Sequence, residues 1–188
     1  MDWKKHYTKT EHSFLSPSSY HWLNYDHEKL ARTYINVMYA KQKGTKIHEL
    51  ASGLIEEKIC LPESNETLNL YVNESIKKGM DTEKLLYYSE NCFGRADAIK
   101  YDEDKKELII HDLKTGTIKA SLNQLKIYAA LFCLDYEISP YEIKKIELTI
   151  FQNNDYISEE AEQEEIDDIA MKIVDFDQYI NKLKEELH

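Results

Sequence analysis

The sequence predicts an α+β domain, in which helices flank a mixed central β-sheet. Three runs within residues 84–115 are rich in β-branched and aromatic side chains and are separated by short polar turns, and residues 143–151 alternate between apolar and polar. The segments around these runs instead repeat apolar residues at helical spacing. An order of helices, then β-β-β-α-β, then a helix is typical of a mixed sheet covered by helices.

Helices are expected before the first strand. Ser16 followed by Pro17 is a good N-cap and first-turn pair, so a short helix should start there. Gly44 is expected to separate two longer helices, and Gly79 is a plausible stop for the last one. The three longer helices are expected over residues 26–40, 45–59 and 65–78.

The rest of the chain is expected to form the sheet and two helices. A short charged turn between two strand patterns, YDEDKKE, predicts a β-hairpin. The last helix has isoleucines along one side and acidic residues elsewhere, which predicts a surface helix packed by its apolar side. The strands are expected over 84–91, 94–101, 107–115 and 143–151, and the helices over 120–135 and 158–187.

The net charge of −11 counts at first against a nucleic-acid enzyme, because phosphate binding needs a basic surface. The acidity is concentrated, however: residues 155–188 carry 3 basic and 12 acidic groups, a net charge of −9. The other 154 residues sum to only −2, so the whole-chain charge does not exclude such an enzyme.

Composition places the chain among cytoplasmic globular proteins. The N-terminus, MDWKKHYTKT, has no apolar core of a signal peptide, and no run of 18 apolar residues predicts a membrane span. The three cysteines, Cys60, Cys92 and Cys133, are odd in number and widely spaced. They indicate neither a disulfide framework nor a CxxC metal site, and we expect scattered thiols in a reducing compartment.

Two carboxylates and a lysine fall on the predicted hairpin. Asp112 and Lys114 are two residues apart on a strand and should share a face, and the hairpin should bring Asp97 close to Asp112. Such a pair suits Mg²⁺ or Mn²⁺, and a lysine beside it could orient or deprotonate a water for phosphodiester hydrolysis. Each piece alone has a simpler interpretation, as a solvated strand edge or a turn cap. The apolar run 108–110 leading into these charges favours a site, because buried charges are costly unless paired or bound.

Four motifs follow one another along the chain: GTKIH (44–48), GRAD (94–97), HDLKTG (111–116) and QLKIYA (124–129). In this order they resemble the RecB-like branch of the PD-(D/E)XK nuclease superfamily. Within it, the segments SPSSYHWLN and GTKIHELA are similar to a group of phage-encoded proteins predicted to be such nucleases. The resemblance covers roughly residues 12–150.

The resemblance implies a restriction-endonuclease-like core of order α-β-β-β-α-β within a single domain over 1–188. It also implies a helical extension over 1–42, a catalytic core over 43–152 and an acidic C-terminal helix over 155–188. Ala96 stands where the superfamily has its name-giving proline, as is usual in the RecB-like branch. The four cysteines that hold an iron–sulfur cluster in some relatives are absent, so we expect no such cluster.

The resemblance also assigns roles to single residues. Lys114 would position the attacking water and stabilise developing charge, and Gln124 and Tyr128, at i and i+4 of a helix, would line the site. The metal ligands would be His48, Asp97, Asp112 and the backbone carbonyl of Leu113. The DNA contacts would come from Arg95, Thr115, Gly116 and Lys119.

The same residues also have purely structural interpretations. His48 could be a polar-face or core histidine, Gln124 and Tyr128 a helix face against the sheet, and Arg95 and Lys119 solvated charges. Two weaker ideas are that Glu56 is an additional acid and that Tyr20, Trp22 and Tyr25 stack on unpaired bases.

The function expected from the sequence is a Mg²⁺- or Mn²⁺-dependent deoxyribonuclease, an exonuclease of phage type in recombination or replication. Its expected partners are DNA and a recombination or replication protein, with no membrane, in the bacterial host cytoplasm if it is phage-encoded. One alternative is a nuclease fold used as a DNA-binding or protein-recruitment module with little catalysis, and another is an acidic protein that binds a basic partner or mimics DNA. The sequence leaves open oligomeric state, strand polarity, strand preference, and exonuclease versus endonuclease action.

Overall fold

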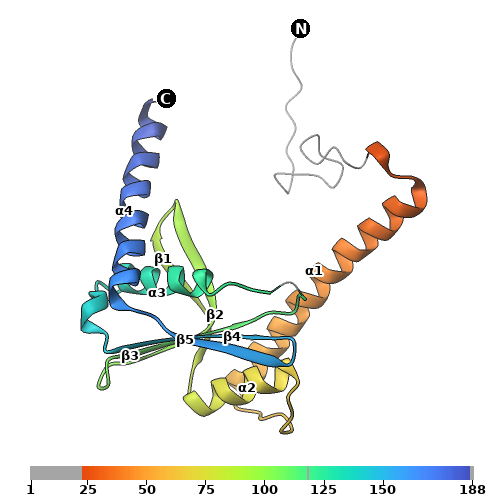
Figure 1. Cartoon of the computed structure of the whole chain (residues 1–188), viewed down its shortest axis with the longest axis horizontal. Helices are drawn as coiled ribbons and strands as arrows, with labels where there is room; N and C mark the ends of the chain where they lie inside the picture. The colour runs from red at the N-terminus through yellow and green to blue at the C-terminus, as the bar shows by residue number, and fades with distance from the viewer. Residues whose placement is uncertain (1–22, 118, 187–188) are drawn as a thin grey trace. The chain divides into compact units, whose positions relative to one another are not determined.

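The computed structural model describes residues 23–117 and 119–186, which fold into helices on both faces of a five-stranded sheet (Figure 1). The chain divides into two compact units, residues 1–45 and 46–188, and the division falls inside the first helix. In chain order the elements are α1 (His27–Glu56), α2 (Thr67–Lys78), β1 (Asp81–Ser89), β2 (Cys92–Asp102), β3 (Glu107–Leu113), α3 (Asn123–Asp135), the short 3₁₀ helix η2 (Pro140–Glu142), β4 (Lys145–Gln152), β5 (Asp155–Glu160) and α4 (Gln163–Glu186).

The described part of the first unit is the beginning of α1. Asp26 Oδ1 accepts a hydrogen bond from the Lys29 N–H at 2.7 Å, which satisfies one of the free N–H groups of the first helical turn. The Lys29 ammonium also lies 4.5 Å from the centre of the Tyr25 ring, a cation–π contact. The helix predicted to begin at Ser16 lies outside the described residues.

A single helix replaces the two that were expected on either side of Gly44. That prediction is wrong, because α1 continues through Gly44 to Glu56. A glycine inside a helix costs only about 1 kcal/mol relative to alanine, and no proline stands nearby to break the backbone ladder. The stop at Gly79 is confirmed: Gly79 has a left-handed backbone (φ 67°), and its N–H and that of Met80 bind the last carbonyls of α2.

The sheet has the strand order β1-β2-β3-β4-β5, in which β3 and β4 are parallel and all other neighbours are antiparallel. Parallel neighbours need a crossover connection, and the chain between β3 and β4 supplies it as α3. The predicted mixed sheet and its β-β-β-α-β order are therefore confirmed.

The last strand, β5, was not predicted. Residues 155–160 pair with β4 at the edge of the sheet, so the expected helix over 158–187 begins later, at Gln163. Asn153 and Asn154 both have positive φ, 54° and 60°, as a two-residue hairpin turn requires. Because five of the six β5 residues are exposed, the strand lacks the apolar alternation by which strands are detected.

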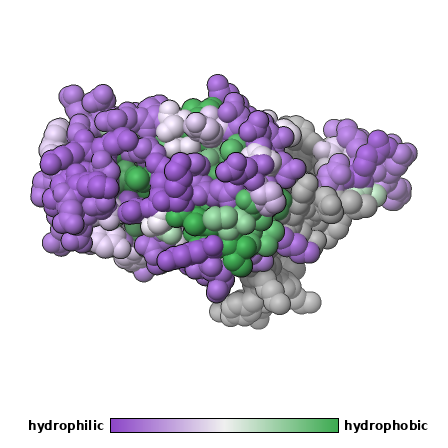
Figure 2. All heavy atoms as spheres, turned by 90° about the horizontal axis from the view of Figure 1, so that it is seen from below, coloured by the Kyte–Doolittle hydropathy of each residue, from purple (hydrophilic) through white to green (hydrophobic). Residues whose placement is uncertain are grey.

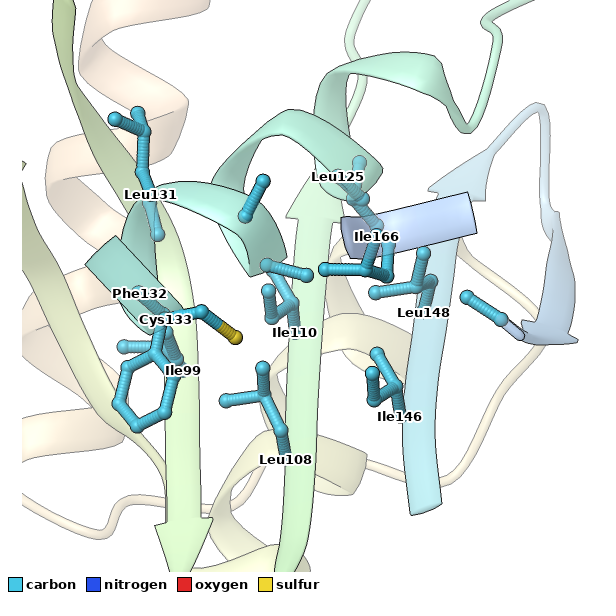
Figure 3. Packing of buried hydrophobic residues seen from close by; sticks show 14 of the residues in the cluster. Ile99, Leu108, Ile110, Leu125, Leu131, Phe132, Cys133, Ile146, Leu148 and Ile166 are labelled. Carbon is cyan, nitrogen blue, oxygen red and sulfur yellow. The ribbon is translucent and has the colours of Figure 1, made fainter. Parts of the chain in front are cut away.

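Each face of the sheet has its own apolar core. On one face, Leu108, Ile110 and Leu148 pack against Leu125 of α3 and Ile166 of α4 (Figure 3). On the other face a second cluster joins the end of α1 and α2 to the sheet through Ala51, Ile55, Val72, Leu113 and Phe151. β3 therefore has both faces covered, which explains its unbroken apolar run over 108–110.

The view from below shows a face on which hydrophilic residues predominate and apolar residues gather near the centre (Figure 2). Among residues 23–117 and 119–186, no helix combines the length and the apolar character needed to cross a bilayer.

Candidate active site

The site begins where β2 and β3 stop pairing. Their backbone ladder ends at Ala98 and His111, although both strands continue. Beyond this point the N–H of Leu113 donates instead to Asp97 Oδ2 at 2.9 Å. A side-chain carboxylate thus takes the place of a backbone partner, and the parting of the two strands makes room for polar groups between them.

Three potential metal ligands converge at Asp97. His48 Nδ1, from α1, lies 3.3 Å from Asp97 Oδ2, and Glu83 of β1 completes a trio whose ligand atoms all lie within 4.8 Å of one another. Glu83 stands across from Asp97, because its neighbours Thr82 and Lys84 pair with residues 98 and 96 of β2. Imidazole nitrogen and carboxylate oxygens are donors that a divalent cation such as Mn²⁺ accepts.

Asp97 influences the pKa values of the other two groups of the trio. The hydrogen bond to Asp97 raises the pKa of the His48 imidazole, against the opposing effect of its burial. Burial raises the pKa of the Glu83 carboxyl, and the negative charge of Asp97 raises it further. Two carboxylates held close to each other favour a shared positive charge, which a proton or a metal ion can supply.

A second polar chain runs from Asp112 to α3. Lys114 Nζ donates to Asp112 Oδ1 at 3.0 Å and to Gln124 Oε1 at 2.8 Å. The Gln124 amide in turn donates to Tyr128 Oη at 3.2 Å. Four of the predicted catalytic residues, from β3, the segment after it and α3, are thus linked in one network.

Asp112 is the most deeply buried acid of the site, with 2% of its side chain exposed. Its Oδ2 lies 2.9 Å from Lys114 Nζ in an ion pair and accepts no hydrogen bond from the described residues. Burial raises the pKa of the Asp112 carboxyl, the charge of Asp97 adds to this, and Lys114 opposes it. The Lys114 ammonium is the cation beside this carboxylate, and the carboxylate and imidazole donors that gather next to it are of the kinds that fit a hard divalent metal.

The predicted ligand set and the observed trio overlap in part. His48 and Asp97 belong to both, whereas Glu83 stands in the trio and Asp112 stands beside it, bound to Lys114. Leu113 enters the site through its N–H, which binds Asp97.

The predicted DNA contacts on the loop after β3 are exposed. Thr115, Gly116 and Lys119 all face solvent, and a Cβ added at Gly116 would meet no atom within 4 Å. Gln152 of β4 holds the loop at two points, since its amide donates to the Gly116 carbonyl at 2.6 Å and its oxygen accepts from the Ala120 N–H at 3.1 Å. The loop is therefore fixed to the sheet while its outer side stays accessible.

Arg95 contacts one member of the trio, Glu83. Its Nη1 donates to the Glu83 carbonyl at 2.8 Å and its Nε lies 4.0 Å from Glu83 Oε2, while 57% of the side chain remains exposed. Glu56 is not a member of the trio, although its charge helps to raise the pKa of Glu83; it accepts hydrogen bonds from Thr82 and Ser52. Tyr20 and Trp22 lie outside the described residues.

Two residues of the site were not found from the sequence. Glu83 was missed because the first strand was expected to begin at residue 84, although the hairpin register would have placed it opposite Asp97. Gly94 belongs to the GRAD motif, but the resemblance implies no role for it. A Cβ at this position would lie 2.8 Å from Tyr128 Cε1, so only glycine lets the Tyr128 ring lie against β2.

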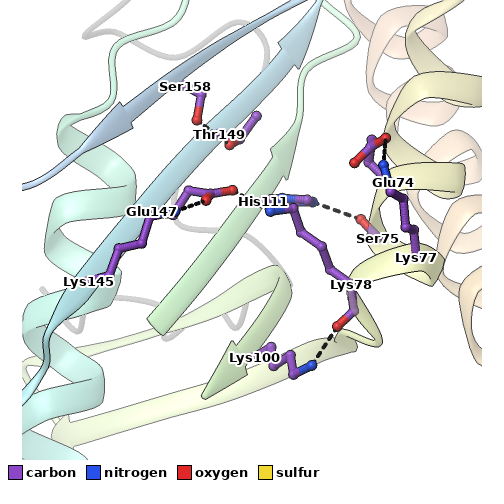
Figure 4. Close-up of polar contacts among 10 residues, drawn as sticks. All are labelled: Glu74, Ser75, Lys77, Lys78, Lys100, His111, Lys145, Glu147, Thr149 and Ser158. Atoms are coloured by element: carbon purple, nitrogen blue, oxygen red, sulfur yellow. Dashed lines mark hydrogen bonds and ion pairs between the residues drawn. The ribbon is translucent and has the colours of Figure 1, made fainter. Parts of the chain in front are cut away.

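His111 occupies the opposite side of β3 from Asp112. It is 1% exposed, and its Nδ1 lies 3.0 Å from Ser75 Oγ of α2 (Figure 4). Burial lowers the pKa of this imidazole to about 3, and the positive charge of Lys78 contributes. The histidine of the HDLKTG motif is therefore a neutral group that packs against α2, separate from the trio.

Comparison with known proteins gives one match: a family model described as "Protein of unknown function (DUF2800)" matches residues 75–184. No curated protein and no solved structure matches the chain. The matched segment contains Glu83, Asp97, Asp112, Lys114 and Gln124, whereas His48 lies before it.

Proposed function

Because the chain belongs to the DUF2800 family of proteins of unknown function, its activity must be argued from its own site, and we propose that it is a metal-dependent deoxyribonuclease. One observation carries the proposal. His48 of α1, Asp97 of β2, and Asp112 and Lys114 at the end of β3 meet where β2 and β3 part, and the Asp112 carboxylate among them is almost completely buried. Acids, an imidazole and a lysine in this arrangement are suited to phosphodiester hydrolysis.

Each side chain has a role in the proposed reaction. Mg²⁺ or Mn²⁺, held by His48, Asp97 and the neighbouring carboxylates, would polarise the scissile phosphate and make bound water more acidic. Lys114 positions the attacking water and balances the negative charge that develops on the phosphate. Gln124 keeps the Lys114 ammonium in place through its 2.8 Å contact, and Tyr128 in turn holds Gln124. In-line attack then leaves a 5′-phosphate.

The wider proposal is an exonuclease of phage type that works on DNA ends in recombination or replication, in the bacterial host cytoplasm. Its partners would be DNA and a recombination or replication protein. The exposed loop carrying Thr115, Gly116 and Lys119 supports this, because an accessible backbone and an exposed ammonium are suitable phosphate contacts.

The direct test replaces Asp112 by Asn and Lys114 by Met, one at a time. Each change should lower the rate of DNA cleavage by about 100-fold or more, since Asp112→Asn removes a charge that would help to hold the metal and Lys114→Met removes the charge that balances the developing negative charge on the phosphate. End-labelled linear and circular DNA, single- and double-stranded, with Mg²⁺ or Mn²⁺, gives the rates, and chelation of the metal should abolish them.

Asp104→Asn and Lys105→Met are the matched controls, because they make the same changes in the turn at the other end of the β2–β3 hairpin. Both should cleave at the wild-type rate, and circular dichroism should show all four variants folded. Full activity of folded Asp112→Asn or Lys114→Met would refute the assignment. Nicking of circular DNA would retain a nuclease but replace exonuclease action by endonuclease action.

A further inference from the structure

The outer half of the β1–β2 hairpin exposes apolar side chains beside the candidate active site. Leu85, Tyr87 and Phe93 are 50%, 40% and 56% exposed. The rings of Tyr87 and Phe93 are stacked on each other, with centroids 5.9 Å apart and planes inclined by 24°. Two exposed rings in a fixed stack offer a flat apolar surface to a ligand.

The strand register places these rings in line with the site. Tyr87 pairs with Phe93 and Leu85 pairs with Arg95, and the next position on this face of β2 is Asp97. The alternate residues point the other way, since Gly94 lies against Tyr128 on α3. At about 3.3 Å per residue, Phe93 stands about 13 Å along the strand from Asp97, which is a reach of a few nucleotides.

A cation lies between the rings and the acids. Arg95 keeps 57% of its side chain exposed while its Nη1 binds the Glu83 carbonyl. A guanidinium held in this way can bind a phosphate with its remaining donors. The face thus presents, in order, an aromatic pair, an arginine and the carboxylates of the trio.

The charges at the hairpin tip select the part of the ligand that can lie there. Tyr87 Oη donates to Glu90 at 3.0 Å, the Tyr87 N–H donates to Asp135 at 2.9 Å, and Asp177 of α4 binds the side chains of Ser89 and Asn91. One ammonium also lies at the tip, that of Lys184, which donates to Asn91 Oδ1, but the carboxylates outnumber it and would repel the phosphates of a duplex laid over the tip. Uncharged bases that stack on the rings meet no such repulsion, and base–aromatic stacking is the usual way in which proteins hold unpaired strands.

We propose that Tyr87 and Phe93 form a stacking platform for the unpaired bases of a single-stranded DNA segment. The platform directs that segment past Arg95 toward the trio of His48, Glu83 and Asp97. The choice of DNA as the ligand rests on the proposed nuclease function. The platform adds the substrate class to that function, namely a single strand or an unpaired end.

The test measures binding in the background of Lys114→Met, so that the DNA stays intact. Fluorescence anisotropy with labelled 12-mer single-stranded and duplex DNA gives both affinities. Replacing Tyr87 and Phe93 together by Ala should weaken single-strand binding by about 10- to 100-fold, as the loss of stacked bases implies. Duplex affinity should change by less than about twofold.

Two further variants test whether any lost binding is due to the aromatic rings at these positions. Tyr87→Leu with Phe93→Leu retains apolar bulk on the strands but removes the rings, so it should lose single-strand affinity as the alanine pair does. Tyr141→Ala removes an aromatic side chain that is 62% exposed on η2 and should change nothing. Equal loss on both DNA forms, or no loss, would overturn the platform. A wild-type dimer that dissociates in the leucine pair would assign the face to self-association instead.

The outcomes separate this inference from the nuclease proposal. If wild-type protein cleaves no DNA but the ring variants lose single-strand binding, the platform stands and the nuclease assignment falls. If wild-type protein cleaves DNA and the ring variants bind and cleave single strands like wild type, the nuclease stands and the platform falls. Tighter binding of a 12-mer RNA than of DNA would overturn the choice of DNA.

Discussion

At the scale of single residues, Gly94 decides whether the Gln124–Tyr128 pair can reach the site. The Tyr128 ring occupies the space in which any larger residue would place its Cβ, 2.8 Å from Cε1. Tyr128 in turn holds Gln124, and Gln124 holds Lys114. The absence of a side chain at Gly94 therefore affects, through Tyr128 and Gln124, the position of the proposed catalytic ammonium of Lys114.

We therefore predict that Gly94→Ala displaces Tyr128, lowers stability by about 1–3 kcal/mol through overpacking and reduces the proposed cleavage. Gly53→Ala is the control, because a Cβ there meets nothing within 4 Å. In the helix α1 it should raise stability by up to about 1 kcal/mol. Denaturant unfolding measures both, and equal effects of the two substitutions would show that the contact with Tyr128 has no importance.

At the scale of elements, an ion-pair cluster joins α2 to the sheet on the face away from the catalytic network. Glu147 of β4 lies 2.6 Å from Lys78 Nζ of α2 and 2.9 Å from Lys145 Nζ (Figure 4). Burial acts to raise the pKa of Glu147, but the two lysines outweigh it and hold that pKa below its ordinary value of 4.5. The ionised carboxylate therefore stabilises the contact between α2 and the sheet.

A depressed carboxyl pKa gives a stabilisation that is complete above the unfolded pKa and disappears as the pH falls through the folded one. The wild type should exceed Glu147→Gln in stability by about 1 kcal/mol near pH 7, discounted for the partial exposure of the lysines. This difference should shrink as the pH drops below about 4.5. Glu74→Gln, which breaks the exposed pair with Lys77, should show almost no difference at any pH. A difference for Glu147→Gln that does not change with pH would contradict the assignment.

At the scale of the whole molecule, the net charge of −11 is distributed rather than uniform. α4 carries much of it, yet the helix is also part of the core, because Ile166 is fully buried and Ala170 nearly so. Its later apolar residues are less covered: Phe176 is 53% exposed and Leu183 is 37% exposed. The prediction of a helix packed along its whole isoleucine side therefore holds only for its first half.

Neutralising α4 tests whether its acidity meets DNA. The triple change Asp175→Asn, Glu185→Gln and Glu186→Gln alters exposed residues and leaves Ile166 in place. DNA affinity should hold or rise, and the dependence of binding on salt should stay the same, because these groups contact no phosphate in the proposed arrangement. Anisotropy titrations at several salt concentrations measure this. A fall in affinity would mean that α4 takes part in binding DNA or is needed to shape the site.

The sequence predicted more of the fold than of the site geometry. The apolar run of β3, the helical spacing of α2 and α3, and the stop at Gly79 are local signals, and each led to the correct element. β5 and the unbroken α1 were missed because their local signals are weak: β5 is an exposed edge strand, and Gly44 is an ordinary helix position with a small energetic cost. Glu83 was missed because its role depends on a neighbour across the hairpin.

By itself, the sequence determined most of the elements, their order and the residue types that could carry metal-assisted chemistry, because periodicity and side-chain chemistry are properties of the chain. Only the tertiary structure decided which groups meet. It put Glu83 beside His48 and Asp97, bound Asp112 to Lys114, and buried the Asp112 carboxylate almost completely. These outcomes depend on strand register, on the parting of β2 from β3 and on burial, and such long-range contacts are fixed only when the sheet forms.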